Sequence, residues 1–232
     1  MTLIEKHKVR WSTAALMWFL FFAFTFLVKF FDVKAIGPSG SMVGFSSLNK
    51  VFADAFPYNH FFHELSDLLG YAAILLDAAF ALVALLQWIN RKKLFKVEKN
   101  LLYLMFFYTL VLAIYVAFTF IVVNYRPVIL EDEGGLESSY PSSHTVLAIA
   151  SCYTGVLNLP ALISKEKSRK YLSVALTVLG LLIIICRIAS GVHWLSDIIG
   201  SLILVSALVM LYLASLTSNG VTKKYQGKRV SK

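Results

Sequence analysis

Three short stretches of the chain combine the residue types that handle phosphate in proteins. Residues 124–127, 141–144 and 187–197 together contain two arginines, two histidines, a carboxylate and two adjacent serines. The planar guanidinium group of arginine binds phosphate oxygens through two parallel hydrogen bonds and stays charged. A neighbouring imidazole and carboxylate can supply a nucleophile and control its proton. The three stretches therefore predict a site for phosphoryl transfer.

Four residues are predicted to bind the phosphate of a substrate. Arg126 and Arg187 would supply the positive charge. Ser142 and Ser143 stand at a predicted helix start, where unpaired backbone N–H groups and the helix dipole favour an anion. Each signal is weak by itself, because an arginine at the membrane rim usually anchors a helix and paired serines usually cap one. Their joint occurrence favours a phosphate site.

Three further residues are predicted to perform the chemistry. His193 and Asp197 are four residues apart, so on one helical face they would form an imidazole–carboxylate pair. The carboxylate would set the tautomer of the ring and leave the other ring nitrogen free to attack phosphorus. His144 is then predicted to be the acid that protonates the leaving oxygen.

The elements that carry these residues are predicted to be membrane-spanning helices. Hydrophobic residues make up 58% of the 232 positions. They fall in runs of about 20, enough to cross a hydrocarbon core roughly 30 Å thick. We therefore expect one all-α domain over residues 1–232, a six-helix transmembrane bundle with its core motifs in residues 119–197. The first run is long and aromatic and no small-residue cleavage site follows it, which favours a retained helix over a signal peptide. The predicted spans lie near residues 11–31, 65–90, 101–123, 145–163, 171–189 and 198–217.

The distribution of charge predicts how the bundle is oriented. The net charge is +9, and 17 of the 22 basic residues fall in four clusters that a six-span arrangement places on one side of the membrane. The positive-inside rule then predicts cytoplasmic termini and an active site at the extracytoplasmic surface. Basic charge thus reflects topology, and we expect no nucleic-acid partner. The clusters are Lys6, Lys8 and Arg10; Arg91, Lys92, Lys93, Lys96 and Lys99; Lys165, Lys167, Arg169 and Lys170; and Lys223, Lys224, Lys228, Arg229 and Lys232. The acidic residues Glu131, Asp132, Glu133 and Glu137 fall on the opposite side.

The order of the spans predicts how the three stretches meet. Span three would run outward and end at Arg126, where Pro127 helps to stop the helix. A loop over residues 128–140 leads to the second stretch. Spans four and five then cross inward and outward again, which returns Arg187 to the same face as the other motifs.

Residues outside the motifs carry predictions of their own. After a turn at residues 37–41, apolar residues recur at roughly helical spacing, which favours either a short interfacial helix or a packed surface loop. Asp77 lies near the middle of span two, where an interhelical hydrogen bond is a better interpretation than catalysis. Cys152 and Cys186 are predicted to be buried free thiols. The sequence has no metal-ligand spacing, and we expect neither a metal nor a cofactor.

With these motifs the chain resembles the type-2 phosphatidic acid phosphatase superfamily, whose members are integral membrane lipid phosphatases. The family pattern is Lys-x6-Arg-Pro, then Pro-Ser-Gly-His, then Ser-Arg-x5-His-x3-Asp. The resemblance implies metal-independent hydrolysis of a lipid phosphate through a phosphohistidine on His193. The matching residues are Arg126 and Pro127 in the first motif, Pro141, Ser142 and His144 in the second, and Arg187, His193 and Asp197 in the third.

Three positions depart from the family pattern. The family lysine falls on Thr119, the glycine on Ser143 and the serine on Cys186. The last two are exchanges between small residues, whereas the loss of the lysine removes one cation from the phosphate cradle. The expected substrate is a polyprenyl diphosphate, a phosphatidylglycerophosphate or a phosphatidic acid, and membrane lipids are the expected surroundings.

Two other function classes compete with a phosphatase. One is a non-catalytic lipid-phosphate binding or transport protein, in which the arginines hold phosphate and the chemistry has lapsed with the lysine. The other is an intramembrane serine hydrolase that uses Ser142 or Ser143. This alternative does not explain why two arginines face outward.

Overall fold

The computed structural model describes residues 3–130 and 134–218, and this part of the chain is helical with short connections. Six of its helices are long and apolar enough to cross a membrane, which confirms the predicted all-α bundle of six spans. The α-helices are α1 (Leu3–Phe30), α2 (Ser46–Ala55), α3 (His60–Arg91), α4 (Lys99–Phe120), α5 (Ser143–Leu162), α6 (Glu166–Ala189) and α7 (Leu195–Ser218).

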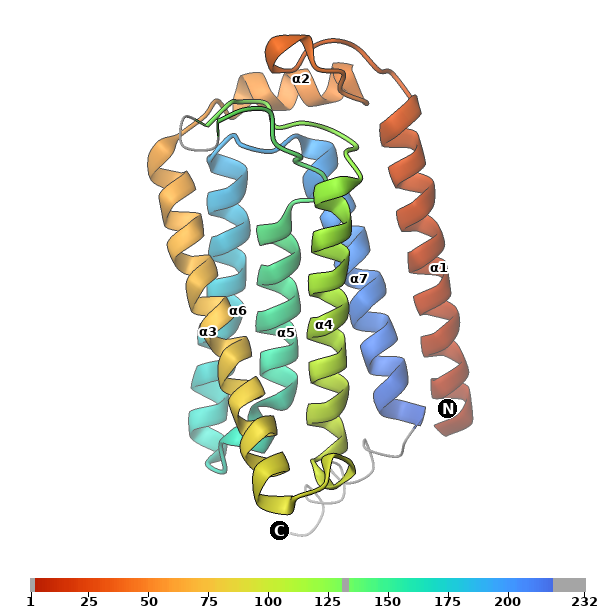
Figure 1. The fold of residues 1–232 in the computed structure, drawn as a ribbon, viewed down its shortest axis with the longest axis vertical. Coiled ribbons are helices and arrows are strands. Elements are labelled where there is room, and N and C mark those ends of the chain that lie inside the picture. Colours follow the sequence, from red (N-terminus) through yellow and green to blue (C-terminus); the bar gives the residue numbers. More distant parts are fainter. Residues whose placement is uncertain (1–2, 131–133, 219–232) are drawn as a thin grey trace.

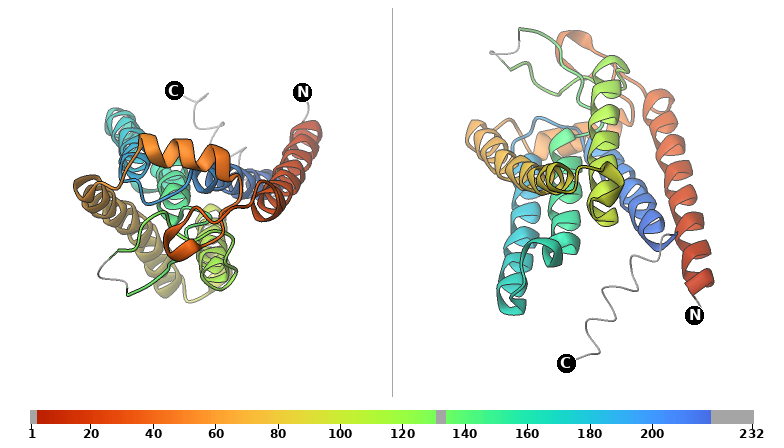
Figure 2. Two further views of the ribbon diagram at one scale, coloured as in Figure 1. Left: turned by 90° about the horizontal axis from the view of Figure 1, so that it is seen from above. Right: turned by 60° about the horizontal axis from the view of Figure 1, so that its bottom comes forward.

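The six long helices run side by side, and the short helix α2 lies across one end of the bundle (Figure 1). Seen from above, α5 occupies the middle (Figure 2, left), where it contacts α3, α4, α6 and α7. Small side chains on α5 permit this central place: a Cβ at Gly155 would come within 2.8 Å of Leu76 Cδ2 on α3. The second motif therefore leads directly into the central helix of the bundle.

The first and last helices pack against each other along the outside of the bundle (Figure 1). Arg10 on α1 donates a hydrogen bond from Nη1 to the carbonyl oxygen of Leu213 on α7 at 3.1 Å. Further along α1, Phe21 stacks against Tyr140, whose hydroxyl lies 2.7 Å from Thr25 Oγ1. Tyr140 directly precedes the second motif, so α1 supports the start of α5 as well as α7.

Of the two alternatives for the segment after the 37–41 turn, a short helix and a packed loop, the structure has the helix, α2, and polar contacts hold it to the bundle. Asn49 Nδ2 donates to Ser196 Oγ at 2.9 Å, and the Ser196 N–H donates to Asn49 Oδ1 at 3.0 Å. Asn49 also donates to the carbonyl oxygen of Gly44 at 2.7 Å. Leu48 and Val51 remain exposed, as expected of a helix with one face toward lipid head groups. Because Ser196 lies in the first turn of α7, α2 fixes the helix that follows the third motif.

The predicted end of span three is wrong. Helix α4 ends at Phe120, six residues before Arg126, so Pro127 does not terminate it. Lys29 Nζ instead donates to the carbonyl oxygen of Val122 at 2.9 Å, and Ser138 Oγ donates to that of Phe118 at 3.1 Å. These two side chains satisfy carbonyl groups that the end of a helix leaves without intrahelical partners.

Asp77 and the two cysteines lie as predicted. Ser151 on α5 donates a hydrogen bond of 2.6 Å to Asp77 Oδ2, which links α3 to α5 inside the bundle. Cys152 and Cys186 are buried free thiols. Of the charged clusters, the loops after α3 and α5 lie at the end of the bundle opposite α2 (Figure 1). Glu131, Asp132 and Glu133 and the basic residues from Lys223 onward lie outside the described residues.

Candidate phosphate site at one end of the bundle

The three predicted stretches meet at the α2 end of the bundle. The Ser142 N–H donates to the carbonyl oxygen of Asp197 at 3.4 Å, which joins the second stretch to the third. Asn124 Nδ2 donates to Asp197 Oδ1 at 3.3 Å, which joins the first stretch to the third. Asp197 is therefore the point at which all three stretches connect.

His193 and Asp197 do not share a helical face as predicted, because α7 begins only at Leu195. His193 lies in the turn before the helix, and Asp197 lies in its first turn. Asp197 Oδ2 accepts the Trp194 N–H at 3.0 Å, as a carboxylate does when it caps a helix start. The same oxygen lies 3.7 Å from His193 Nδ1, close enough for charge interaction but too far for a hydrogen bond. The pair is thus formed by a turn against a helix start.

His193 presents a buried imidazole ring to the site. Its side chain is 4% exposed, and neither ring nitrogen forms a hydrogen bond of good distance and angle with another described residue, although the backbone of Ser139 lies near enough to the ring to raise its pKa slightly. Burial lowers the pKa of His193 well below 6.5, and the nearby Arg187 and Arg126 guanidinium groups lower it further. At neutral pH the ring is therefore uncharged and carries the lone pair that a nucleophile needs.

The turn that presents His193 packs closely against the chain that follows α2. Gly191 has φ +66°, and a Cβ there would lie 2.6 Å from the carbonyl oxygen of Phe56, just past the end of α2. The Asn59 N–H donates to the carbonyl oxygen of Ser190 at 3.0 Å. Only glycine adopts this backbone without strain and also fits against the neighbouring chain.

A second cluster joins His144 and Arg187 through a residue that the sequence did not indicate. Asp67 Oδ1 on α3 lies 3.0 Å from His144 Nε2 and 3.0 Å from Arg187 Nη1. The same Nη1 lies 3.1 Å from Ser66 Oγ and 3.0 Å from His63 Nδ1. The Arg187 side chain is 1% exposed, so α3 holds its guanidinium group deep in the site. The close spacing of His63, Ser66 and Asp67 near the start of span two is a sequence pattern that could have indicated these residues as part of the site.

Arg126 is held by the loop that follows it. Arg126 Nη2 lies 2.9 Å from Glu137 Oε2, and its N–H donates to the Glu137 carbonyl oxygen at 2.9 Å. A bridge between Tyr125 and Ser138 brings the two ends of this loop together. Both arginines predicted to bind phosphate therefore contact carboxylates, Arg126 through Glu137 and Arg187 through Asp67.

The two serines differ in what they can offer an anion. Helix α5 begins at Ser143, as predicted, and Ser142 occupies the N-cap position. Ser142 is fully buried, and its hydroxyl accepts a hydrogen bond from Thr145 Oγ1 at 3.1 Å. Ser143 is partly exposed. Of the pair, Ser143 is the one whose side chain remains accessible.

Thr119, in the place of the family lysine, lies outside this cluster. It is exposed on the last turn of α4, where its hydroxyl donates to the carbonyl oxygen of Val116 at 2.7 Å. The position therefore supplies no charge.

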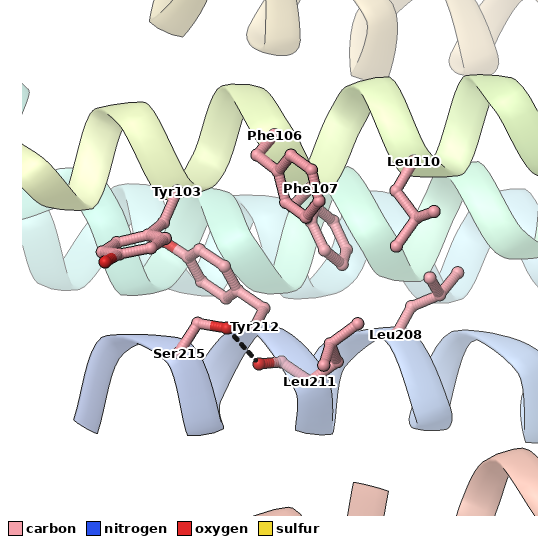
Figure 3. A pocket seen from close by; sticks show the side chains of 8 residues that line it. All are labelled: Tyr103, Phe106, Phe107, Leu110, Leu208, Leu211, Tyr212 and Ser215. Atoms are coloured by element: carbon pink, nitrogen blue, oxygen red, sulfur yellow. Dashed lines mark hydrogen bonds between the residues drawn. The ribbon is translucent and has the colours of Figure 1, made fainter. Parts of the chain in front are cut away.

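An apolar pocket between α4 and α7 belongs to a different part of the bundle (Figure 3). Its volume of about 20 Å³ has room for roughly one water molecule. None of its lining residues belongs to the three motifs. The residues around it are Tyr103, Phe106, Phe107, Leu110, Leu208, Leu211, Tyr212 and Ser215.

Comparisons with known proteins give a family and a similar fold. The sequence model of a family described as the PAP2 superfamily matches residues 100–221, which contain all three stretches but not Asp67. A solved structure with a similar fold is the crystal structure of the first transmembrane PAP2 type phosphatidylglycerolphosphate phosphatase from Bacillus subtilis. It is 21% identical in sequence, with a TM-score of 0.54 over 91% of this chain and 96% of that chain. No curated protein matches the chain.

Proposed function

Because the chain belongs to the PAP2 superfamily, we propose that it is a membrane phosphatase that hydrolyses a lipid phosphate through a phosphohistidine on His193. The observation that carries this proposal is the state of the His193 ring. It is buried and uncharged at neutral pH, and neither ring nitrogen forms a hydrogen bond of good distance and angle with another described residue. A buried polar group normally has a hydrogen-bond partner, so an imidazole left in this state suits a ligand that supplies one.

The first step transfers the phosphoryl group to the protein. His193 Nδ1 faces the Asp197 carboxylate at 3.7 Å, which leaves Nε2 to attack phosphorus. As the bond from nitrogen to phosphorus forms, the bond from phosphorus to the leaving oxygen breaks and His144 donates a proton to that oxygen. The Asp197 carboxylate stabilises the positive charge that the phosphorylated ring acquires.

The second step returns the histidine to its starting state. A water molecule attacks the phosphohistidine, and His144, now deprotonated, takes a proton from that water. The bond between nitrogen and phosphorus breaks, and inorganic phosphate leaves. His144 is therefore the acid of the first step and the base of the second.

The arginines would bind the phosphate after release from their carboxylates. A phosphate dianion offers Arg126 and Arg187 more negative charge than Glu137 and Asp67 do singly, and its oxygens match the fork of each guanidinium group. Ser143 and the start of α5 add backbone N–H groups of the kind that favour an anion. Bound in this way, the phosphate would contact the His193 ring.

The lipid class is a further part of the proposal. The six apolar helices support a substrate that arrives from a membrane. A polyprenyl diphosphate, a phosphatidylglycerophosphate and a phosphatidic acid all present phosphate at the bilayer surface. The likeness in fold to a phosphatidylglycerolphosphate phosphatase makes the second of these the first to test.

Phosphate release from the purified protein in detergent tests the activity. We expect release from at least one of the three lipid classes, and we expect it to persist in strong chelator because the arginines and a helix start can neutralise the phosphate. Inhibition by vanadate is also expected. If chelator abolished phosphate release and addition of a divalent metal ion restored it, the metal-independent mechanism would be contradicted.

The site is proposed to face the extracytoplasmic side of the cell membrane, with both termini in the cytoplasm. A cysteine introduced at Glu133 should react in intact cells with a thiol reagent that cannot cross membranes, whereas one at Lys96 should not. The native Cys152 and Cys186 are buried and give little background. The reverse labelling pattern would overturn this orientation.

A non-catalytic binding or transport protein remains the second candidate, favoured by the exposed, uncharged Thr119 at the family lysine position. It predicts phosphate-dependent lipid binding with no phosphate release from any of the three lipid classes. A serine hydrolase is less well supported, because Ser142 is fully buried with its hydroxyl in a hydrogen bond to Thr145. Labelling by a fluorophosphonate probe would support the hydrolase.

A further inference from the structure

We propose that Asp67 is a positioning residue for the acid step, which holds the ring of His144 in place and links it to Arg187. This inference rests on the proposed function, because it assumes that His144 protonates the leaving oxygen. Asp67 lies outside residues 100–221, so the family match assigns it no role.

The first argument is the geometry of a single oxygen atom. Asp67 Oδ1 lies 3.0 Å from His144 Nε2 and 3.0 Å from Arg187 Nη1, so one carboxylate oxygen connects the acid to a phosphate-binding arginine. Contacts between a carboxylate and a cationic group are the shorter and stronger kind of hydrogen bond. Bound in this way, the imidazole cannot rotate without breaking a contact at 3.0 Å.

The second argument is that α3 also limits the ring by packing. Gly70 lies one turn after Asp67, and a Cβ there would come within 3.1 Å of His144 Cδ2 and 3.4 Å of its Nε2. The ring therefore lies directly against the backbone of α3. Asp67 and Gly70 together confine His144 from two adjacent turns of one helix.

The third argument concerns the ring nitrogen of His144 that does not contact Asp67. With Nε2 held by Asp67, the remaining nitrogen of His144 is Nδ1, which is buried and has no hydrogen-bond partner in the described part of the chain. A substrate oxygen is a partner of the kind that this nitrogen lacks. The carboxylate thus fixes which nitrogen is available to the leaving group.

The fourth argument is how Asp67 itself is held. His63 Nε2 lies 3.8 Å from Asp67 Oδ2, and His63 Nδ1 lies 3.0 Å from Arg187 Nη1. Asp67 is 31% exposed, so it remains reachable from the mouth of the site. The acid is therefore positioned by a charged network rather than by apolar packing alone.

The test measures how the variant Asp67→Asn depends on the leaving group. A lipid alkoxide needs a proton as it leaves, whereas p-nitrophenolate does not. We expect kcat on a lipid monophosphate to fall by about 10- to 100-fold and kcat on p-nitrophenyl phosphate to fall less than about threefold. Loss of the ion pair to Arg187 should change KM for both substrates alike, and KM should fall rather than rise, because Arg187 no longer has to be released from a carboxylate before it binds phosphate. Gly70→Ala should reproduce the selective fall in kcat.

Glu64→Gln is the matched control, because Glu64 is exposed one turn earlier on the same helix and loses the same charge. It should leave both rates unchanged. The double variant Asp67→Asn with His144→Ala should be no slower on the lipid than His144→Ala alone, since both changes remove one function. Thermal stability in detergent identifies a variant that fails to fold.

Three outcomes would overturn the inference: equal loss of kcat on both substrates, additive loss in the double variant, or an equal effect of Glu64→Gln. Failure of the proposed function looks different. In that case the unaltered protein releases no phosphate from either substrate.

Discussion

Two imidazole–carboxylate pairs of the described residues, His193–Asp197 and His144–Asp67, differ in depth and in distance. Asp197 is fully buried and lies 3.7 Å from the His193 ring, while its oxygens accept hydrogen bonds from Trp194 and Asn124. Asp67 is 31% exposed and lies 3.0 Å from the His144 ring. The first carboxylate is fixed by the fold around it, and the second is fixed mainly by the charged groups it contacts.

This difference fits two different tasks. A nucleophile must be uncharged and held in one place before the substrate arrives, which deep burial provides at His193. An acid must gain and lose a proton in each cycle, which requires access to solvent and a partner of opposite charge. On this proposal, the more deeply buried pair contains the nucleophile and the more exposed pair contains the acid.

The largest expected effect comes from removing the nucleophile. His193→Ala should lower phosphate release by about 10⁴-fold or more on every substrate, because the proposed mechanism forms the intermediate on His193. Rapid quenching should trap an acid-labile phosphoprotein in the unaltered protein and none in the variant. Phosphate trapped on His144 would reverse the assignment of the two pairs.

The fixed carboxylate should matter for every leaving group. Asp197→Asn should slow turnover of a lipid monophosphate and of p-nitrophenyl phosphate alike, by about 100-fold, because control of the His193 tautomer is weakened. It should also lower the melting temperature, since an amide cannot accept hydrogen bonds on both of its polar atoms where Trp194 and Asn124 donate. A loss confined to the lipid would show that Asp197 serves the acid instead.

Removing the acid should separate the substrates. His144→Ala should lower kcat on a lipid monophosphate by about 10²–10⁴-fold, and on p-nitrophenyl phosphate by less than about tenfold, provided that both bind. The rates of the two substrates are measured side by side on one preparation. Equal loss on both would mean that His144 binds phosphate rather than donating a proton.

The smallest expected effect is a shift in pH dependence. The pKa of His193 is lowered well below 6.5, by burial first and then by the two arginines. Activity should therefore persist below pH 6.5 and be lost as the pH falls through this lowered pKa, because a protonated ring cannot attack. Arg126→Gln removes a minor cause, so it should move the acid limb of kcat/KM slightly toward higher pH. A limb that stays in place would show that Arg126 does not contribute to the lowered pKa of His193.

The spans and the meeting of the motifs were predictable because they depend on local composition. Runs of about 20 apolar residues locate a helix wherever its neighbours lie. The cost of exposing an acid to lipid also predicted that the Asp77 side chain faces the inside of the bundle. Both predictions are confirmed, the second by the hydrogen bond from Ser151.

The errors arose where distant residues decide the outcome. Helix α4 ends at Phe120 with Lys29, some 90 positions earlier in the chain, bound to the carbonyl group of Val122. Asp67 reaches His144 and Arg187 across comparable separations, and nothing in the local pattern of α3 names those partners. The His193–Asp197 spacing fits one helical face, but a four-residue interval does not show that α7 begins only at Leu195, two residues after His193.

The contact between α1 and α7 has a consequence for biogenesis. A chain leaves the ribosome from its N-terminus, so the surfaces that receive the third motif are synthesised first. Asn49 is made before Ser196, Phe56 before Gly191, and Arg10 before Leu213. A nascent chain that ends before α7 already contains both arginines, His144 and His193 but lacks Asp197. Under the proposed mechanism, the His193–Asp197 pair is therefore complete only after the final helix has been synthesised and inserted.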